Sequence, residues 1–117
     1  MDNILIIDDS PINLEFLSMY FEKFNAETTK VYSTEEARKE ISNKSFDMTF
    51  LDYHMPIEDG VAFIKAMEAN NLLDKLGKII VVTADTNFDA KKFGVSKYIS
   101  GMLSKPLDIN DLDKLLE

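Results

Sequence analysis

Residues 4–11 read ILIIDDSP, an apolar run followed by two aspartates and a serine–proline pair. Four consecutive apolar residues, most of them β-branched, are typical of a strand that is covered on both faces, as in a parallel sheet. Serine is a preferred helix N-cap and proline a preferred first helical residue, so Ser10 and Pro11 predict the start of a helix. The stretch therefore predicts a strand, a short acidic loop and a helix, which is the repeating unit of an α/β protein.

The same alternation continues to the end of the chain. Further strands are predicted at about 27–32, 46–51, 78–82 and 102–103, and helices at about 11–23, 33–43, 61–69, 87–96 and 108–117. Gly94 lies inside the 87–96 helix and lowers its helix propensity. The order (βα)5 predicts an α/β fold with a five-stranded parallel sheet, helices on both faces and a single domain over residues 1–117.

Composition excludes several classes of function. The net charge of −8 would repel nucleic-acid phosphates and anionic lipids, so we expect no direct nucleic-acid or membrane contact. The chain has no cysteine, which excludes thiol catalysis and disulfides and suits the cytoplasm. No apolar run approaches the roughly 20 residues that span a bilayer, and the first residues lack the pattern of a signal peptide.

Polar residues with complementary chemistry follow four of the predicted strands. They are Asp8 with Asp9, Asp52, Thr83 and Lys105. Ligands of open parallel sheets bind at the carboxyl ends of the strands, so we expect these side chains to converge on one edge. Each residue alone has an ordinary explanation, such as a solvated turn, a helix cap or a surface lysine. Their occurrence at four strand ends indicates a functional site.

This set of side chains fits phosphoryl transfer to a carboxylate. Three clustered carboxylates repel one another and favour a hard divalent cation, for which Mg²⁺ is the natural candidate. Such a cation neutralises charge on the phosphoryl group while one carboxylate oxygen attacks in line. Lys105 and Thr83 offer an ammonium and a hydroxyl to the remaining phosphoryl oxygens.

Four motifs in this order resemble those of the receiver domains of two-component response regulators. They are IIDDS at 6–10, FLDYHMP at 50–56 with an Asp-Gly pair at 59–60, VTA at 82–84 and LSKP at 103–106. The resemblance covers essentially the whole chain and implies a flavodoxin-like sheet of order 2-1-3-4-5.

The same resemblance implies a role for each site residue. Asp52 would be the phosphoacceptor, and Mg²⁺ would be bound by Asp9, Asp52 and the backbone carbonyl of His54, with Asp8 assisting through water. Thr83 and Lys105 would sense and stabilise the phosphoryl group.

The resemblance also implies partners. A histidine kinase or a histidine phosphotransfer protein would supply phosphohistidine, and hydrolysis would reset the switch. A downstream protein would bind the face formed by the fourth helix, the fifth strand and the fifth helix.

Other functions fit the sequence less well or remain open. The chain could be the receiver segment of a hybrid sensor histidine kinase, because SPINL at 10–14 resembles the first helix entry of such receivers. Whether the parent chain is an enzyme stays open, since a receiver catalyses only its own phosphorylation and dephosphorylation. An aspartyl hydrolase would need a second carboxylate where His54 stands. A flavin-binding function is disfavoured because the loops contain no cluster of Gly, Ser and Thr that could bind the flavin phosphate. A pseudo-receiver, which would only bind partners, is disfavoured because all four site positions are filled.

Four residues raise questions about how such a switch would be read out. Met102 stands where the family usually has the aromatic ring that moves with the threonine, and Tyr98 could supply that ring instead. Either residue could equally be ordinary core or surface filling. His54 and Asp85 fall at positions that tune dephosphorylation in the family, and a tuning role of His54 would make the lifetime of the phosphorylated form vary between about pH 6 and 8. The alternative is that His54 is an exposed loop side chain of which only the backbone carbonyl is used.

Overall fold

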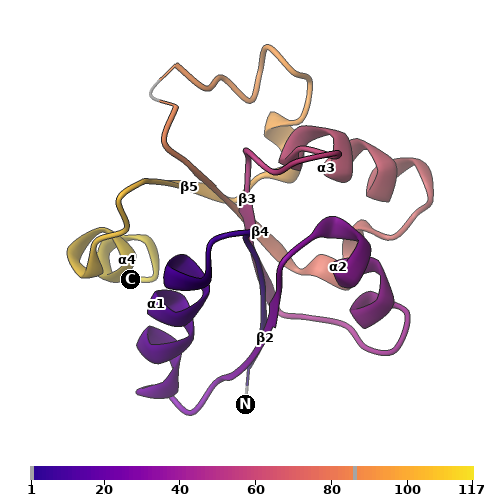
Figure 1. The fold of residues 1–117 in the computed structure, drawn as a ribbon. Coiled ribbons are helices and arrows are strands. Elements are labelled where there is room, and N and C mark those ends of the chain that lie inside the picture. The colour runs from indigo at the N-terminus through magenta and orange to yellow at the C-terminus, as the bar shows by residue number, and fades with distance from the viewer. Residues whose placement is uncertain (1, 86) are drawn as a thin grey trace.

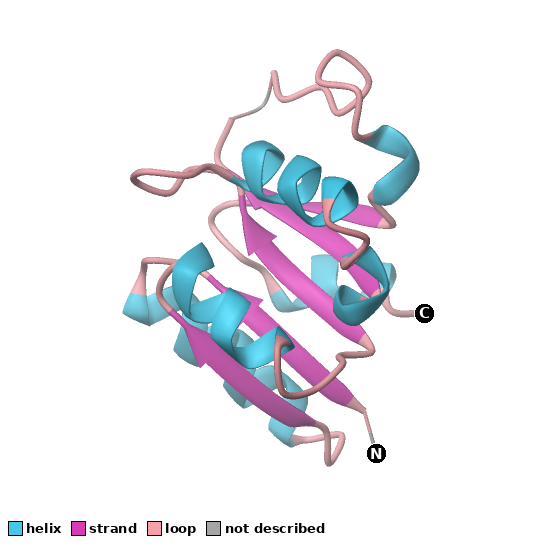
Figure 2. Cartoon of the chain, turned by 90° about the vertical axis from the view of Figure 1, so that its right-hand side faces the viewer, coloured by secondary structure: helices cyan, strands magenta, loops and turns pink. Residues whose placement is uncertain are grey.

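The computed structural model describes residues 2–85 and 87–117, and its centre is one parallel sheet of five strands (Figures 1 and 2). The strands are β1 (Asn3–Ile7), β2 (Glu27–Val31), β3 (Met48–Asp52), β4 (Lys78–Thr83) and β5 (Gly101–Ser104). They follow the order β2-β1-β3-β4-β5, and every neighbouring pair is parallel. The predicted sheet and its order are therefore confirmed.

In the part of the chain that the structure describes, four α-helices cover the two faces of the sheet. They are α1 (Pro11–Glu22), α2 (Thr34–Ile41), α3 (Gly60–Ala69) and α4 (Ile109–Leu115), with short 3₁₀ turns η1 (Leu73–Leu76) and η2 (Ser96–Tyr98). Figure 1 shows α1 and α4 on one side of the sheet and α2 and α3 on the other. At the start of each helix a polar N-cap side chain accepts a hydrogen bond from a backbone N–H of the first turn. The accepting side chains are those of Ser10, Ser33, Asp59 and Asp108. These caps explain why each helix begins where it does.

The alternation of side chains along the strands builds two cores. Phe50 of β3 is buried against α1 and α4, whereas its neighbour Leu51 is buried against α2 and α3. Successive strand residues point to opposite faces, so one continuous apolar strand supplies both cores. Burying a side chain of this size stabilises the fold by about 1.5 to 3 kcal/mol. Helices therefore pack against both faces of the sheet, and this packing holds the ends of the strands in place.

The predicted helix over 87–96 is wrong. The described residues of this segment form turns, followed by η2. The carboxylates of Asp85 and Asp89 each accept the backbone N–H two residues further along, at 2.8 and 3.0 Å, which draws those amides into local turns. Gly94 then adopts a positive φ of 75°, outside the helical region. The face expected to contain a fourth helix is therefore built differently, and α4 is the helix that was predicted as the fifth.

Other boundaries differ by no more than about two residues, the usual uncertainty of a helix or strand end. The helix predicted to run to residue 43 ends at Ile41, and the strand predicted from residue 46 begins at Met48. Phe46 is buried just ahead of that strand, where its N–H donates to the carbonyl of Lys75 at 2.8 Å.

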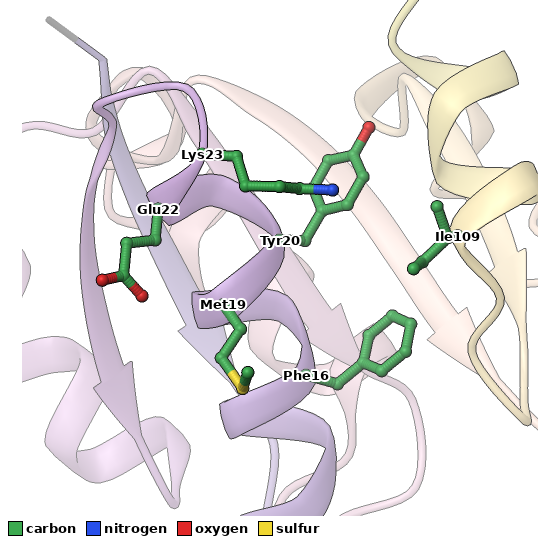
Figure 3. Close-up of a pocket in the computed structure, with 6 residues that line it drawn as sticks. All are labelled: Phe16, Met19, Tyr20, Glu22, Lys23 and Ile109. Carbon is green, nitrogen blue, oxygen red and sulfur yellow. The ribbon is translucent and has the colours of Figure 1, made fainter.

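A hollow of about 590 Å³ lies between α1 and α4. Figure 3 shows Phe16 and Tyr20 of α1 facing Ile109 of α4 across it. Neither the clustered aspartates nor Lys105 lines this hollow. No helix within residues 2–85 and 87–117 has the length and apolar character needed to cross a membrane.

Candidate functional site at the carboxyl edge of the sheet

The polar residues predicted at the strand ends lie at one edge of the sheet. Asp8 directly follows β1, Asp52 and Thr83 end β3 and β4, and Lys105 directly follows β5. Figure 2 shows the strand arrows pointing toward the same end of the sheet. Asp8, Asp52 and Thr83 are only 2 to 3% exposed, whereas Asp9 is exposed. Buried polar groups at the end of a rigid sheet are typical of a binding or catalytic site.

The three aspartates form one cluster of oxygen donors. One carboxylate oxygen from each of Asp8, Asp9 and Asp52 lies within 4.8 Å of the other two. Hard cations such as Mg²⁺ prefer such ligands. Asp52 Oδ2 is buried and has no hydrogen-bond partner among the described residues. A buried carboxylate oxygen in this state is costly unless a cation or a bound group contacts it, so the cluster fits a divalent cation.

Lys105 carries the positive charge closest to this cluster. Its Nζ lies 3.2 Å from Asp52 Oδ1 and 3.4 Å from Asp8 Oδ2. The lysine therefore contacts both buried carboxylates and partly offsets their mutual repulsion. Its backbone N–H donates to the carbonyl of Thr83 at 2.9 Å, which joins the ends of β4 and β5.

Two backbone amides orient the buried carboxylates. The N–H of Ser10 donates to Asp8 Oδ1 at 2.9 Å, and the N–H of His54 donates to Asp52 Oδ1 at 3.3 Å. Both donors lie two residues after the acceptor, in the loops that leave β1 and β3. The second bond directs Oδ1 of Asp52 toward the backbone and leaves Oδ2 without a partner.

Burial, and after it the negative charge of Asp8, raise the pKa of Asp52 from its ordinary value to about 6. The ammonium of Lys105 and the N–H of His54 act in the opposite direction but do not offset the burial. A nearby cation would favour the ionised form of Asp52, which is the form that can attack an electrophile.

Thr83 presents a hydroxyl at the end of β4. Its Oγ1 accepts the backbone N–H of Asp85 at 2.9 Å, which leaves the hydroxyl hydrogen available to donate. Asp85 in turn accepts the N–H of Asn87 at 2.8 Å. The hydroxyl is thus connected by hydrogen bonds to the start of the segment that was expected to be helical.

An aromatic cluster next to Asp52 was not predicted. The ring of Tyr53 lies 4.5 Å from the ring of His54 and 4.6 Å from that of Phe88, measured between centroids. Phe93 lies 6.1 Å from Tyr53 and stacks on Phe88 at 5.8 Å. The segment after β4 is therefore held to the end of β3 by rings rather than by a helix. These contacts could not be predicted from periodicity in the sequence, because Tyr53 is far from Phe88 and Phe93 along the chain.

Met102 and Tyr98 occupy different surroundings. The Met102 side chain on β5 is 41% exposed, so it does not fill a core cavity. Tyr98 is partly buried at the edge of the core between the sheet and α3, and Lys97 Nζ lies 5.1 Å from its ring centre. Tyr98 is thus a core-edge residue, and its place in a switch stays a prediction.

Comparison with known proteins agrees with this architecture. A family model of the response regulator receiver domain matches residues 4–117. The chain belongs to this family. Receiver domains are the signal-receiving modules of two-component systems, and they generally bind Mg²⁺ at an acidic pocket.

Relatives of this receiver domain include both regulators and kinases. It is 29% identical to the transcriptional regulatory protein ZraR of Salmonella typhimurium, covering 98% of this chain and 25% of ZraR. It is 32% identical to the hybrid signal transduction histidine kinase M of Dictyostelium discoideum, covering 97% of this chain and 5% of the kinase. The chain therefore spans a quarter or less of the length of these two relatives.

Solved structures give the same fold. The chemotaxis protein CheY4 of Vibrio cholerae matches with a TM-score of 0.85 and 27% identity, over 99% of this chain and 96% of that one. A sensor protein from Polaromonas sp. JS666 matches with a TM-score of 0.84 and 27% identity, over 98% and 92% of the two chains. The fold is the CheY-like, flavodoxin-type fold, with four α-helices within residues 2–85 and 87–117.

Proposed function

We propose that this receiver domain is a phosphorylation switch in which Asp52 accepts the phosphoryl group. The observation that carries the proposal is the state of the Asp52 carboxylate. Its Oδ1 is held by Lys105 and by the His54 amide, whereas its buried Oδ2 has no partner in the described part of the chain. One oxygen is thus oriented and the other is left for bond formation.

The reaction proposed is transfer from a phosphohistidine donor. Asp52 Oδ2 forms a bond to phosphorus, the bond from phosphorus to the histidine nitrogen breaks, and the electron pair stays on that nitrogen. Lys105 Nζ, already 3.2 Å from Asp52 Oδ1, contacts a phosphoryl oxygen, and the Thr83 hydroxyl donates its free hydrogen to another. Water later attacks phosphorus, and the Asp52 carboxylate leaves.

Mg²⁺ is the metal that fits this donor set. We propose Asp9, Asp52 and the backbone carbonyl of His54 as its ligands, with Asp8 assisting through water. When bound, the metal neutralises negative charge that develops during transfer. The protein holds Asp8 and Asp52 in place with the amides of Ser10 and His54, so little rearrangement of those carboxylates is needed.

The partners follow from the same reaction. A histidine kinase or a histidine phosphotransfer protein would supply the phosphohistidine in the cytoplasm. A downstream protein would bind the face that includes β5 and α4, where Met102 is exposed. We expect no direct nucleic-acid contact, because the net charge is −8. A receiver within a hybrid histidine kinase is the second candidate, and it is favoured by the 32% identity to such a kinase.

Mass spectrometry after incubation with a small phosphodonor and Mg²⁺ tests the proposal. The wild-type chain should gain one acid-labile phosphoryl group, and Asp52→Asn should gain none. Asp74→Asn is a matched control, because Asp74 lies in η1, before the opposite end of β4, and it should be phosphorylated like the wild type. No adduct on the wild type, or an equal adduct on Asp52→Asn, would refute the assignment.

A further inference from the structure

The loop between β3 and α3 contains a strained residue. Ile57 has a φ of 74°, a left-handed backbone that β-branched residues rarely adopt because the side chain clashes with its own backbone. Its side chain is fully exposed, at 108% of the reference area, so no packing of that side chain offsets the strain. The conformation of this turn must therefore be held by neighbouring residues.

Glu58, the next residue, is held by α2. Its carboxylate accepts two hydrogen bonds from the Arg38 guanidinium, at 2.6 and 2.8 Å, and one from the Thr34 hydroxyl at 2.5 Å. The Glu58 side chain is 22% exposed, and Thr34 is buried. A bidentate arginine–carboxylate pair is directional, so it fixes both the distance and the angle between the loop and α2.

The same loop begins with residues of the site. The Tyr53 carbonyl accepts the N–H of Gly60 at 2.9 Å, which closes the two ends of the loop on each other. Between them, the His54 N–H donates to Asp52 Oδ1. A shift of Glu58 would therefore be transmitted through the three intervening loop residues to the peptide groups that flank His54.

We propose that Arg38 is a positioning residue for the metal site: by holding Glu58 it keeps the turn at Ile57 closed, and with it the His54 peptide, whose N–H contacts Asp52 and whose carbonyl is a proposed metal ligand. This inference rests on the proposed function, in which that carbonyl is a metal ligand. Without Arg38, Glu58 loses its bidentate partner and Ile57 relaxes toward an extended backbone. The loop then moves away from the cluster, and Mg²⁺ binds more weakly.

Arg38→Met tests the clamp directly. Methionine keeps an unbranched apolar stem, which preserves packing because the Arg38 side chain lies over the Phe63 ring at 5.3 Å. Mg²⁺ binding is followed by NMR titration of the amides at 8–10 and 52–54, without any phosphodonor. We expect at least a threefold weaker affinity in Arg38→Met. The control Lys30→Met removes the exposed ion pair between Lys30 and Glu15 and should leave the affinity unchanged.

A rescue variant separates positioning from general destabilisation. Glycine adopts a positive φ without a clash, so Ile57→Gly in the Arg38→Met background should recover much of the lost affinity. In metal-free protein, hydrogen exchange of the His54 amide should be faster in Arg38→Met and slower again in the double variant. If Arg38→Met does not fold, Arg38→Lys serves instead, because it keeps the charge and loses the bidentate geometry.

Equal Mg²⁺ affinities in the wild type and Arg38→Met would overturn the inference, as would the absence of any recovery in the double variant. Failure of the proposed function looks different. It would appear as a wild-type chain that gains no phosphoryl group at Asp52 under saturating Mg²⁺. A wild type that is phosphorylated, together with an unaffected Arg38→Met, would overturn the clamp alone.

Discussion

Asp52 is subject to two opposing electrostatic effects. Burial and the neighbouring Asp8 raise its pKa to about 6, whereas the Lys105 ammonium lowers it. The folded chain therefore keeps a proton on Asp52 at pH values where the unfolded chain has released it. The stability that this group contributes is present below the ordinary aspartate range and is lost as the pH rises through 6.

The first prediction concerns this pH dependence. In EDTA, the free energy of unfolding of the wild type should fall by about 1 kcal/mol relative to Asp52→Asn between pH 5 and 7.5. Urea denaturation of both proteins at several pH values measures the difference. A free energy of unfolding that changes with pH by the same amount in both proteins would contradict this prediction. Added Mg²⁺ should reduce the difference, because the metal favours the ionised carboxylate.

The convergence of the candidate site residues on one edge of the sheet could be predicted from the sequence for a physical reason. Asp8, Asp52, Thr83 and Lys105 each directly follow or end an apolar strand, and parallel strands end at the same edge. The Arg38–Glu58 pair was not accessible, because no periodicity links a helix residue to a loop residue 20 positions later. Side-chain pairs of this kind depend on the three-dimensional packing of α2 against the loop.

At the scale of elements, the segment from Asn87 to Val95 differs most from expectation. Apolar spacing there suggested a helix, but local aspartate turns and the positive φ of Gly94 prevent one. The apolar residues Phe88 and Phe93 instead contact Tyr53. The strands were easier to predict because their continuous apolar runs can be satisfied only in the interior of the sheet.

The second prediction compares two glycines that both have a positive φ. A β-carbon at Gly77 would clash with the Asp47 carbonyl group, whereas one at Gly94 would meet nothing within 4 Å. Gly77→Ala should therefore destabilise the fold by at least about 2 kcal/mol, and Gly94→Ala by only about 1 kcal/mol.

Chemical denaturation of the two glycine variants measures this difference. Equal losses would show that backbone strain alone, and not the contact with Asp47, decides the cost. A larger loss at Gly94 would contradict the open surroundings of that residue.

At the scale of the whole molecule, the strands contribute to a hydrophobic core on each face of the sheet and also carry the candidate site at their carboxyl ends. The core with α1 and α4 and the core with α2 and α3 lie on opposite faces of the same strands, and the candidate site residues lie at or just beyond the strand ends. A ligand bound at the candidate site would therefore contact the ends of β1, β3, β4 and β5 together. A ligand that binds only the folded chain should stabilise all of them at once.

The third prediction is that Mg²⁺ raises the melting temperature. At ten times its dissociation constant, the metal should add about 1.4 kcal/mol and raise the midpoint by about 5 °C. Differential scanning calorimetry with Mg²⁺ and with EDTA measures the shift. Asp9→Asn should fold normally, because Asp9 is exposed, and should lose most of the shift. A shift of the same size in Asp9→Asn would place the bound metal elsewhere.

The contacts of Lys105 with Asp8 and Asp52 have a consequence for how the protein matures. The Lys105 ammonium offsets the charge of these buried carboxylates, so a newly synthesised chain is expected to fold its sheet without a bound metal. Under the proposed function, Mg²⁺ binding would then be a late and reversible event, separate from folding. Refolding from urea should accordingly proceed at the same rate with EDTA as with Mg²⁺, and a refolding rate that requires the metal would contradict this order of events.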